Sequence, residues 1–372
     1  MPGTMKAAQL VAIGEPLQLR EVPVPELGGE DVLVRIARCG FNGGDPHLVT
    51  GDVRVSPDYM PSVKLPLTFG HDGCGIVAQV GPRAQGFQVG DRVYISSSMD
   101  CGHCIYCRTN RAHICENKEV RGWLTYKPNP SFAPYKDGFC AEYALAHYSH
   151  LHKLPDDVSF EVAGHLGILG VVYLAAKRAR LGHGDVVVIT GATGCTGAAA
   201  VLVSQLFNPR KIIAVARERR KLERLRAVDP HLIEAVSIVE EDLPQRLLEL
   251  TEGQGADVLL DFIPRGAETT QQAIYRLRPG GRVVLVGGCT EEICVSYRFI
   301  MRYSLEISSS RGSSHPDIPV IMDFVRSGRL DLSPIAIRNF PLEEANEAMR
   351  ALIERPGGDP LWVSVLPNPG LD

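Results

Sequence analysis

Four closely spaced cysteines are the strongest chemical feature of this 372-residue sequence. They follow the spacing C-x2-C-x2-C-x7-C and are Cys101, Cys104, Cys107 and Cys115. Four thiolates at such spacings can surround one Zn²⁺ tetrahedrally without an open position, which is typical of a structural site. An iron–sulfur centre is the alternative interpretation. We expect a structural zinc here, about one per chain.

A glycine-containing turn in the stretch DVVVITGATGCTGAAAVLVSQL (185–206) has the residues of a nucleotide site. Its A-x-G-x-x-G pattern lies between a predicted strand and a predicted helix, as in the dinucleotide fingerprint. Small residues there allow the tight turn and the close approach of a pyrophosphate, and the helix N-terminus offers free amides. The candidate cofactor residues are Ala192, Gly194, Cys195, Thr196, Gly197 and, after a later strand, Gly287.

The end of the next predicted strand indicates which nicotinamide cofactor is used. NAD sites place a carboxylate there to bind the ribose 2′-hydroxyl, whereas IIAVARERRK has Ala216 followed by Arg217, Arg219 and Arg220. Guanidinium groups suit a 2′-phosphate. We therefore expect NADP(H), with NAD as the less favoured cofactor, and we count Ala216, Arg217 and Arg220 as cofactor residues.

The segment RCGFNGGDPHLVTGD (38–52) resembles a metal-binding segment in outline, because a cysteine, an aspartate and a histidine are close together. The position expected to hold a metal ligand is nevertheless Asn42. An amide oxygen is a poor zinc ligand compared with a thiolate or an imidazole.

Composition excludes several classes of function. The chain is 45% hydrophobic and 22% charged, with a net charge of -4 and a pI near 6.3. No bulk positive field points to nucleic acid or to an anionic membrane. The N-terminal residues do not resemble a signal peptide, and no long apolar run predicts a membrane helix. We expect a cytoplasmic protein that acts on a small-molecule substrate.

The predicted elements divide the chain into two kinds of structure. Residues 1–155 contain short β-type runs separated by turn signals, which predicts a barrel-like all-β half. From about 160, strands alternate with helices, beginning with one long helix over SFEVAGHLGILGVVYLAAKRA (159–179). This alternation predicts a doubly wound parallel sheet. The stretch between the predicted helix ERRKLERLRA and the predicted strand DVLLDF is expected to be irregular. A late helical region and a final strand, LWVSVLP, follow.

Taken together, these motifs resemble the medium-chain dehydrogenase/reductase family, best known for zinc alcohol dehydrogenases. Matching stretches include GEDVLVRI, FGHDGCGIVAQVG, GFCAEYAL and LRPGGRVVLVGG. The resemblance implies an α/β fold with a GroES-like β-barrel catalytic domain (1–160, zinc lobe about 97–118) and a Rossmann domain (161–300). Residues 301–372 would return to complete the first domain. It also implies a nicotinamide in the cleft between domains, and a homodimer or homotetramer.

The resemblance fails where the family binds catalytic zinc. Its C-G-[ST]-D-x-H segment, aligned on Asp45 and His47, replaces the cysteine ligand with Asn42 and the relay hydroxyl with Gly44. The second ligand is present as His71 in FGHDG, while the third position holds Gly167. We therefore predict that the structural zinc is kept and the catalytic zinc is lost.

The alternative is a catalytic zinc with unusual ligands. Some polyol dehydrogenases that resemble this family use the acid beside the histidine, so Asp72 could join His71, with His165 or Cys39 as a displaced third ligand. The chain would then be an alcohol dehydrogenase or carbonyl reductase. A third interpretation is a non-catalytic protein that binds NADPH.

The leading hypothesis is an NADPH-dependent reductase of an activated C=C or C=N bond. GFNGGDPHLVTG is similar to the G-x-N-x-x-D segment of the family's zinc-free quinone and enoyl reductases. The candidate catalytic residues are Asn42, His47, His71 and Asp72. The donors would stabilise a developing enolate, and His47, His71 or Tyr59 would supply a proton.

Two aromatic-rich segments, 52–66 and 121–139, are longer than the family's usual connections. They could cover an apolar substrate pocket. Tyr59 and Trp123 are the candidate pocket residues within them.

Overall fold

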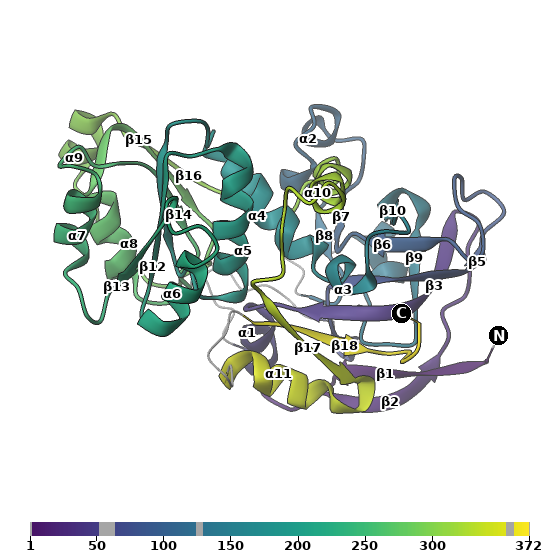
Figure 1. Cartoon of the computed structure of the whole chain (residues 1–372). Coiled ribbons are helices and arrows are strands. Elements are labelled where there is room, and N and C mark those ends of the chain that lie inside the picture. Colours follow the sequence, from purple (N-terminus) through teal and green to yellow (C-terminus); the bar gives the residue numbers. More distant parts are fainter. Residues whose placement is uncertain (1, 52–63, 124–128, 355–360, 372) are drawn as a thin grey trace.

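The computed structural model describes residues 2–51, 64–123, 129–354 and 361–371. They form a β-rich part and an α/β part that adjoin each other (Figure 1). Within these ranges, every helix is too short or too polar to cross a bilayer.

The β-rich part is organised around the long strand β3 (Asp31–Phe41), of which only Arg35 is exposed. In the seven-stranded sheet, the order is β10-β6-β5-β3-β18-β17, and β9 pairs additionally with β3. A small sheet, β2-β1-β4, packs beside it. The bounds are β1 (Thr4–Leu10), β2 (Gln18–Pro23), β4 (Leu67–Thr68), β5 (Asp72–Val80), β6 (Arg92–Ile95), β9 (Tyr143–His147) and β10 (Leu151–Lys153).

Helix α1 (Asp45–Thr50) follows β3 after a short loop that holds Asn42, the position that aligns with the family's cysteine ligand. Pro46 in the first turn suits a helix start, and the helix ends at Gly51 with φ 78°. The cysteine-rich lobe lies between β7 (Ser98–Met99) and β8 (Glu119–Val120), and contains α2 (Ile105–Arg108), η1 (Ala112–Ile114) and little else that is regular.

The α/β part is a six-stranded parallel sheet in the order β13-β12-β11-β14-β15-β16. This is the doubly wound order that binds dinucleotides where the strand order reverses, so the predicted fold class is confirmed. The strands are β11 (Val186–Thr190), β12 (Lys211–Ala216), β13 (Ile233–Ser237), β14 (Ala256–Asp261), β15 (Leu277–Leu285) and β16 (Glu306–Ser309). The helices are α4 (Leu166–Arg178), α5 (Cys195–Ser204), α6 (Arg219–Arg226), α7 (Leu243–Leu250), α8 (Ala267–Ile274) and α9 (Tyr297–Tyr303).

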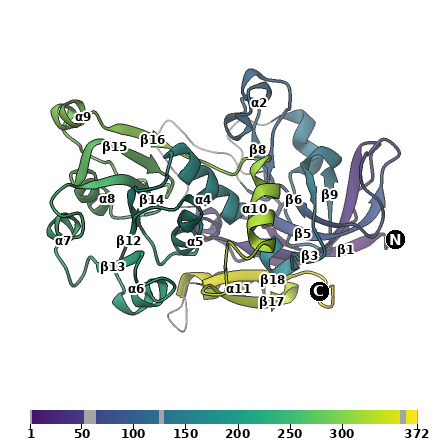
Figure 2. The ribbon, with the colours of Figure 1, turned by 45° about the horizontal axis from the view of Figure 1, so that its top comes forward.

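The chain then returns to the β-rich part. Helix α10 (Asp317–Arg326) lies against α4 at the junction of the two parts (Figure 2). Strands β17 (Ala336–Pro341) and β18 (Leu361–Leu366) pair in parallel, and β18 pairs with β3. Helix α11 (Ala345–Glu354) packs on both returning strands.

Two sequence predictions of elements were wrong. The single helix expected over residues 159–179 is divided into α3 (Phe160–Ala163) and α4. The break lies beside β3, where a Cβ at Gly40 would be 1.9 Å from the carbonyl oxygen of Gly164. The stretch between α6 and β14, which we expected to be irregular, contains β13 and α7.

Candidate functional site

A cleft of about 970 Å³ lies between the two parts and is lined by residues of both. The loop after β3, the start of β5 and the start of α4 meet the glycine turn after β11 there. The two sides touch directly, because the amide of Gly43 donates to Cys195 Sγ at 3.2 Å. The four candidate catalytic residues, Asn42, His47, His71 and Asp72, all line this cleft.

The Asn42 side chain is held by hydrogen bonds on both sides of its amide. Its Oδ1 accepts from the amide of Gly44 at 2.8 Å, and its Nδ2 lies 2.6 Å from His71 Nε2. Because the Gly44 amide can only donate, Asn42 presents its oxygen to Gly44 and its NH₂ to the imidazole. The backbone amide of Asn42 donates to Asp45 Oδ2 at 2.6 Å.

This arrangement fixes the tautomer of His71. Since Nε2 accepts from Asn42, the ring proton is on Nδ1, which lies 3.2 Å from the fully buried carboxylate of Asp45. Burial lowers the pKa of His71, but Asp45 and the charge of Asp72 outweigh it, so the pKa is raised overall. Nε2 of His71 therefore has a hydrogen-bond partner in Asn42, while Nδ1 has only the nearby carboxylate of Asp45, at ion-pair distance.

Asp72 caps the start of α4 and does not face His71 as a second ligand would. Its Oδ1 accepts from the amide of Gly167 at 3.1 Å, where the helix dipole favours a negative charge. A Cβ at Gly167 would lie 2.6 Å from Asp72 Oδ2, so the carboxylate fills the space in which a ligand side chain would begin. Burial raises the pKa of Asp72 to about 7.

His165 and Cys39, which the sequence offered as possible third zinc ligands, contact other groups in the structure. His165 is fully buried, stacks on Trp362 with centroids 4.5 Å apart, and directs its ring nitrogens to the carbonyls of Glu161 and Val363. Cys39 is fully buried, with its Sγ 3.5 Å from that of Cys140. Neither residue lines the cleft.

The glycine turn has the close approaches that a dinucleotide requires. A Cβ at Gly197 would lie 2.1 Å from the carbonyl oxygen of Gly191, and one at Gly287 would lie 2.3 Å from that of Ile263. Gly194, Cys195, Thr196, Gly197, Ala216, Arg217 and Gly287 line the cleft. Ala192 is fully buried behind the turn and does not line it.

The arginines after β12 do not all face the cleft. Arg219 instead forms ion pairs with Glu240 and Glu241, and exposed Arg220 also lies outside the lining. The helical periodicity of α6 explains this, since neighbouring residues point in different directions. Lys221, which we did not single out from sequence, lines the cleft and pairs with Glu218 at 2.7 Å.

The four cysteines of the lobe converge as the spacing predicted. Their Sγ atoms all lie within 4.8 Å of one another, which suits one tetrahedral ion. Among the described residues, this is the cluster of cysteines, histidines and carboxylates that is close enough to hold a metal.

One predicted pocket residue contacts the site. The rings of Trp123 and His71 have centroids 4.7 Å apart, and Trp123 lines the cleft. Tyr59 and most of the first aromatic segment lie outside the described residues. Sequence reasoning missed the polar wall formed by Ser98, Lys118, Ser310 and Arg311, because no motif connects these distant positions.

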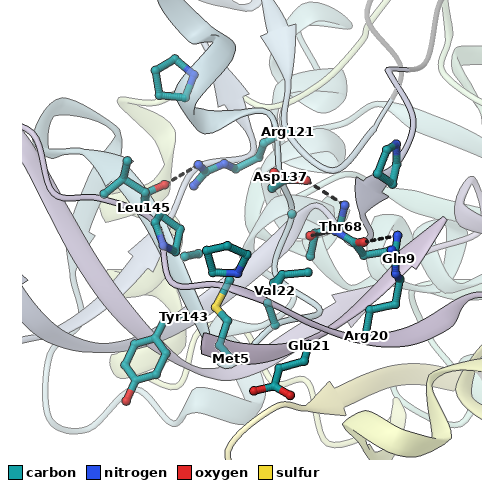
Figure 3. A pocket seen from close by; sticks show the side chains of 17 residues that line it. Met5, Gln9, Arg20, Glu21, Val22, Thr68, Arg121, Asp137, Tyr143 and Leu145 are labelled. Carbon is teal, nitrogen blue, oxygen red and sulfur yellow. Dashed lines mark hydrogen bonds between the residues drawn. The ribbon is translucent and has the colours of Figure 1, made fainter. Parts of the chain in front are cut away.

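A second hollow of about 500 Å³ lies beside β1 and β2 (Figure 3). Its buried cation, Arg121, donates to the carbonyls of Tyr135 and Leu145, and Asp137 accepts from the amide of Thr68. These charged groups serve the fold, and none of the candidate cofactor or catalytic residues line this hollow. The interdomain cleft is therefore the candidate active site.

Comparison with known proteins agrees with this geometry. Residues 28–156 match the family described as Alcohol dehydrogenase GroES-like domain, and residues 195–327 match Zinc-binding dehydrogenase. An NAD-dependent alcohol dehydrogenase of Sulfurisphaera tokodaii is 31% identical over 351 residues, covering 93% of this chain and 95% of that protein. An alcohol dehydrogenase of Geobacillus stearothermophilus is also 31% identical, with 94% and 96% covered.

A solved structure gives the same result. Alcohol dehydrogenase TADH from Thermus sp. ATN1 superposes with a TM-score of 0.83 at 28% identity, covering 97% of this chain and 99% of that one. The chain therefore belongs to the zinc-type medium-chain dehydrogenase/reductase family. It is an oxidoreductase that uses a nicotinamide cofactor.

Proposed function

We propose that this protein is an NADPH-dependent reductase of an activated C=C or C=N bond that works without a catalytic zinc. The observation that carries the proposal is the contact between Asn42 Nδ2 and His71 Nε2 at 2.6 Å. That contact uses the imidazole nitrogen that would otherwise bind the metal.

The other candidate zinc ligands also do not form a catalytic zinc site. A third ligand at position 167 is missing, and the Asp72 carboxylate occupies its place against the α4 amides. Catalytic zinc sites use three protein ligands. His71 and Asp72, with their present hydrogen bonds, do not supply such a set.

The side chains of the cleft can instead bind and polarise an activated alkene. When bound, the dihydronicotinamide supplies a hydride. Asn42 Nδ2 has a second N–H beyond the one given to His71, and this amide, fixed by Gly44 and His71, can donate to an oxygen on which enolate charge develops. Trp123 beside His71 excludes water from one side.

Proton delivery falls to His47 or His71, which line the same cleft. Nδ1–H of His71 faces Asp45, which leaves Nε2 to accept from Asn42 while the ring is neutral. As pH falls, Nε2 can accept a second proton. We assign His71 mainly the role of positioning Asn42, and His47 the role of exchanging the proton with solvent.

For the cofactor, Arg217 and Lys221 support a 2′-phosphate, because both line the cleft at the end of β12 where NAD sites have an acid. The test is the ratio of kcat/KM for NADPH over NADH. Ala216→Asp combined with Arg217→Ala should reverse the preference, with a loss for NADPH of about tenfold or more. Arg83→Gln, at an exposed arginine outside the cleft, is the control, and an unchanged ratio in the double variant would contradict the assignment.

For the lobe, the four converging thiols support one structural zinc. We also propose that the chain forms a homo-oligomer, a homodimer or homotetramer. Apolar side chains at the sheet edge formed by β16 and at α9 support this, since Tyr297 is 82% and Met301 60% exposed.

The deciding experiment combines metal analysis with a substrate panel. We expect about one zinc per chain in protein purified without added metal or chelator, and NADPH oxidation with enones in preference to saturated aldehydes. About two zinc ions per chain, with chelator-sensitive turnover of alcohols and aldehydes only, would instead identify the altered-ligand alcohol dehydrogenase. Cofactor binding without any turnover would indicate a non-catalytic protein.

A further inference from the structure

A polar cluster on one wall of the cleft has no part in the proposed hydride transfer. It brings together β7, the residues just before β8 and the loop after β16, which are far apart in sequence. A Cβ at Gly312 would lie 2.5 Å from Lys118 Nζ and 3.5 Å from Ser98 Oγ, so these side chains crowd the same backbone position. Ser98, Lys118 and Gly312 all line the cleft.

The cluster carries two positive charges. Burial and the nearby charge of Arg311 lower the pKa of Lys118 to about 8, and both side chains line the cleft. Lys118 Nζ donates to the uncharged carbonyl of His113 at 3.2 Å. Asp100 is the carboxylate in range of Lys118, and it is shared with the thiol of Cys107. Lys118 and Arg311 thus place two cationic side chains in the lining of the cavity.

A buried hydroxyl in the same wall lacks a partner. Ser310 is 5% exposed, and within the described chain its Oγ makes no hydrogen bond. Buried hydroxyls are usually satisfied by protein, water or ligand. Because Ser310 lines the cleft and precedes Arg311, a group bound there would meet the hydroxyl and the guanidinium together.

The cofactor's own phosphates have a different location in the cleft. The pyrophosphate belongs at the N-terminus of α5, and a 2′-phosphate belongs beside Arg217 and Lys221 at the end of β12. Lys118 and Ser98 instead come from the β-rich part, which also supplies Asn42 and His71. The anion that this wall suits is therefore on the substrate side.

We propose that the substrate of this enzyme carries an anionic group, a carboxylate or a phosphate, bound by Lys118, Arg311 and the hydroxyl of Ser310. This inference rests on the proposed function, in that the cleft must hold the reacting alkene. It makes Lys118 and Arg311 specificity-determining residues that fix the orientation of the substrate by charge-assisted hydrogen bonds.

The test uses one enone in two charge states, trans-4-oxo-2-pentenoate and its methyl ester, with NADPH. The acid should be reduced with a kcat/KM about tenfold or more above that of the ester. Lys118→Gln and Arg311→Gln should each reduce this ratio toward one, and Lys118→Arg should restore most of it. Arg83→Gln, at an exposed arginine between β5 and β6 outside the cleft, should leave the ratio as it is.

Inorganic phosphate and acetate distinguish the two sources of negative charge. If the natural group is a phosphate, phosphate should compete with the methyl ester, with an inhibition constant at least about tenfold below that of acetate, and Arg311→Gln should abolish the difference. Acid preference without selective phosphate inhibition identifies a carboxylate. Equal rates for acid and ester, together with equal inhibition by both anions, would overturn the proposal.

Measurement of the zinc content and circular dichroism of each variant distinguishes a structural role of Lys118 from anion binding. If Lys118→Gln loses zinc while Arg311→Gln keeps the acid preference, Lys118 supports the cysteine lobe and the proposal is wrong. Product analysis shows failure of the proposed function differently, because the C=C bond of neither acid nor ester would then be reduced, even if a carbonyl reductase reduces the 4-oxo group. Phosphate binding to the NADP⁺ complex, measured by calorimetry in wild type and Arg311→Gln, still tests the anion site in that case.

Discussion

At the scale of single residues, the most informative side chain is Asn42. It stands where the family has a cysteine ligand, and its amide joins the loop backbone at Gly44 to the imidazole of His71. An amide that is oriented before substrate binds needs little reorganisation as charge develops, which is the condition for effective electrostatic stabilisation. Under the proposed function, Asn42 is a fixed hydrogen-bond donor in the place of a Lewis acid.

Replacing Asn42 tests this role directly. Asn42→Ala should lower kcat for enone reduction by about 10²-fold, the usual cost of removing one oxyanion donor. Asn42→Asp preserves the shape but not the N–H donor, and should lose a similar amount. Steady-state kinetics at saturating NADPH measure both variants. A fully active Asn42→Asp would show that donation is not the function of this side chain.

Asp72 should make stability depend on pH. Its folded pKa of about 7 is above the ordinary value of 3.8, so the folded protein holds the proton more tightly than the unfolded chain. Asp72 therefore contributes up to about 4 kcal/mol to the free energy of unfolding. This contribution is fully present below the ordinary pKa and is lost as pH rises toward 7.

Urea unfolding of wild type and Asp72→Asn between pH 4 and pH 8 measures this contribution. As pH rises through about 7, the unfolding free energy of the wild type should fall relative to that of Asp72→Asn. A difference that is constant across the range would contradict the raised pKa.

At the scale of elements, the start of α4 shows how a helix terminus can exclude a metal ligand. Asp72 accepts from the Gly167 amide and leaves no space for a Cβ at that position. The glycine is therefore required by the cap, and the cap is possible because the glycine is there.

A double-mutant cycle measures this mutual dependence. Gly167→Ala should destabilise the protein by about 1–3 kcal/mol through overpacking. In an Asp72→Ala background the cost should be smaller by more than about 0.5 kcal/mol, because the conflicting carboxylate is gone. Urea denaturation of the four proteins gives the coupling, and additive effects would mean that Asp72 moves aside without cost.

The sequence was sufficient for elements with strong local signals. The strand, glycine turn and helix over 185–206 and the cysteine spacing both depend on neighbours in the chain, and both have the expected geometry. The helix break at Gly164 has no local signal in the sequence, and the close contact of Gly164 with Gly40 of β3 is made only by the fold. The same limit applies to Lys118 and Arg311, which only the fold brings together.

At the scale of the whole molecule, the cysteine lobe is attached to the wall of the cleft. The four thiols lie between β7 and β8, and Lys118 and Val120 continue directly from them into the cavity lining. An ion in the lobe would thus stabilise the substrate side of the cleft without touching the substrate.

Removal of that ion should lower the thermal stability of the protein without preventing NADPH binding. Chelation at neutral pH, or Cys115→Ser, should lower Tm by about 5 °C or more, because binding free energy of a structural zinc is folding free energy. NADPH binding, measured by fluorescence, should persist, since the parallel sheet is independent of the lobe. Cys289→Ser, outside the lobe, is the control; loss of NADPH binding on chelation would contradict this independence.

The position of β18 has a consequence for how the chain is made. This strand, Leu361–Leu366, pairs with the central strand β3, and Trp362 Nε1 donates to the carbonyl of Cys195 at the start of α5. Synthesis proceeds from the N-terminus, so β3 emerges from the ribosome long before its partner. The α/β part can fold while the nascent chain is still growing. The β-rich part can form the pairs of β3 with β5 and β9 early, but β3 gains its remaining partner only after the whole α/β part has been made.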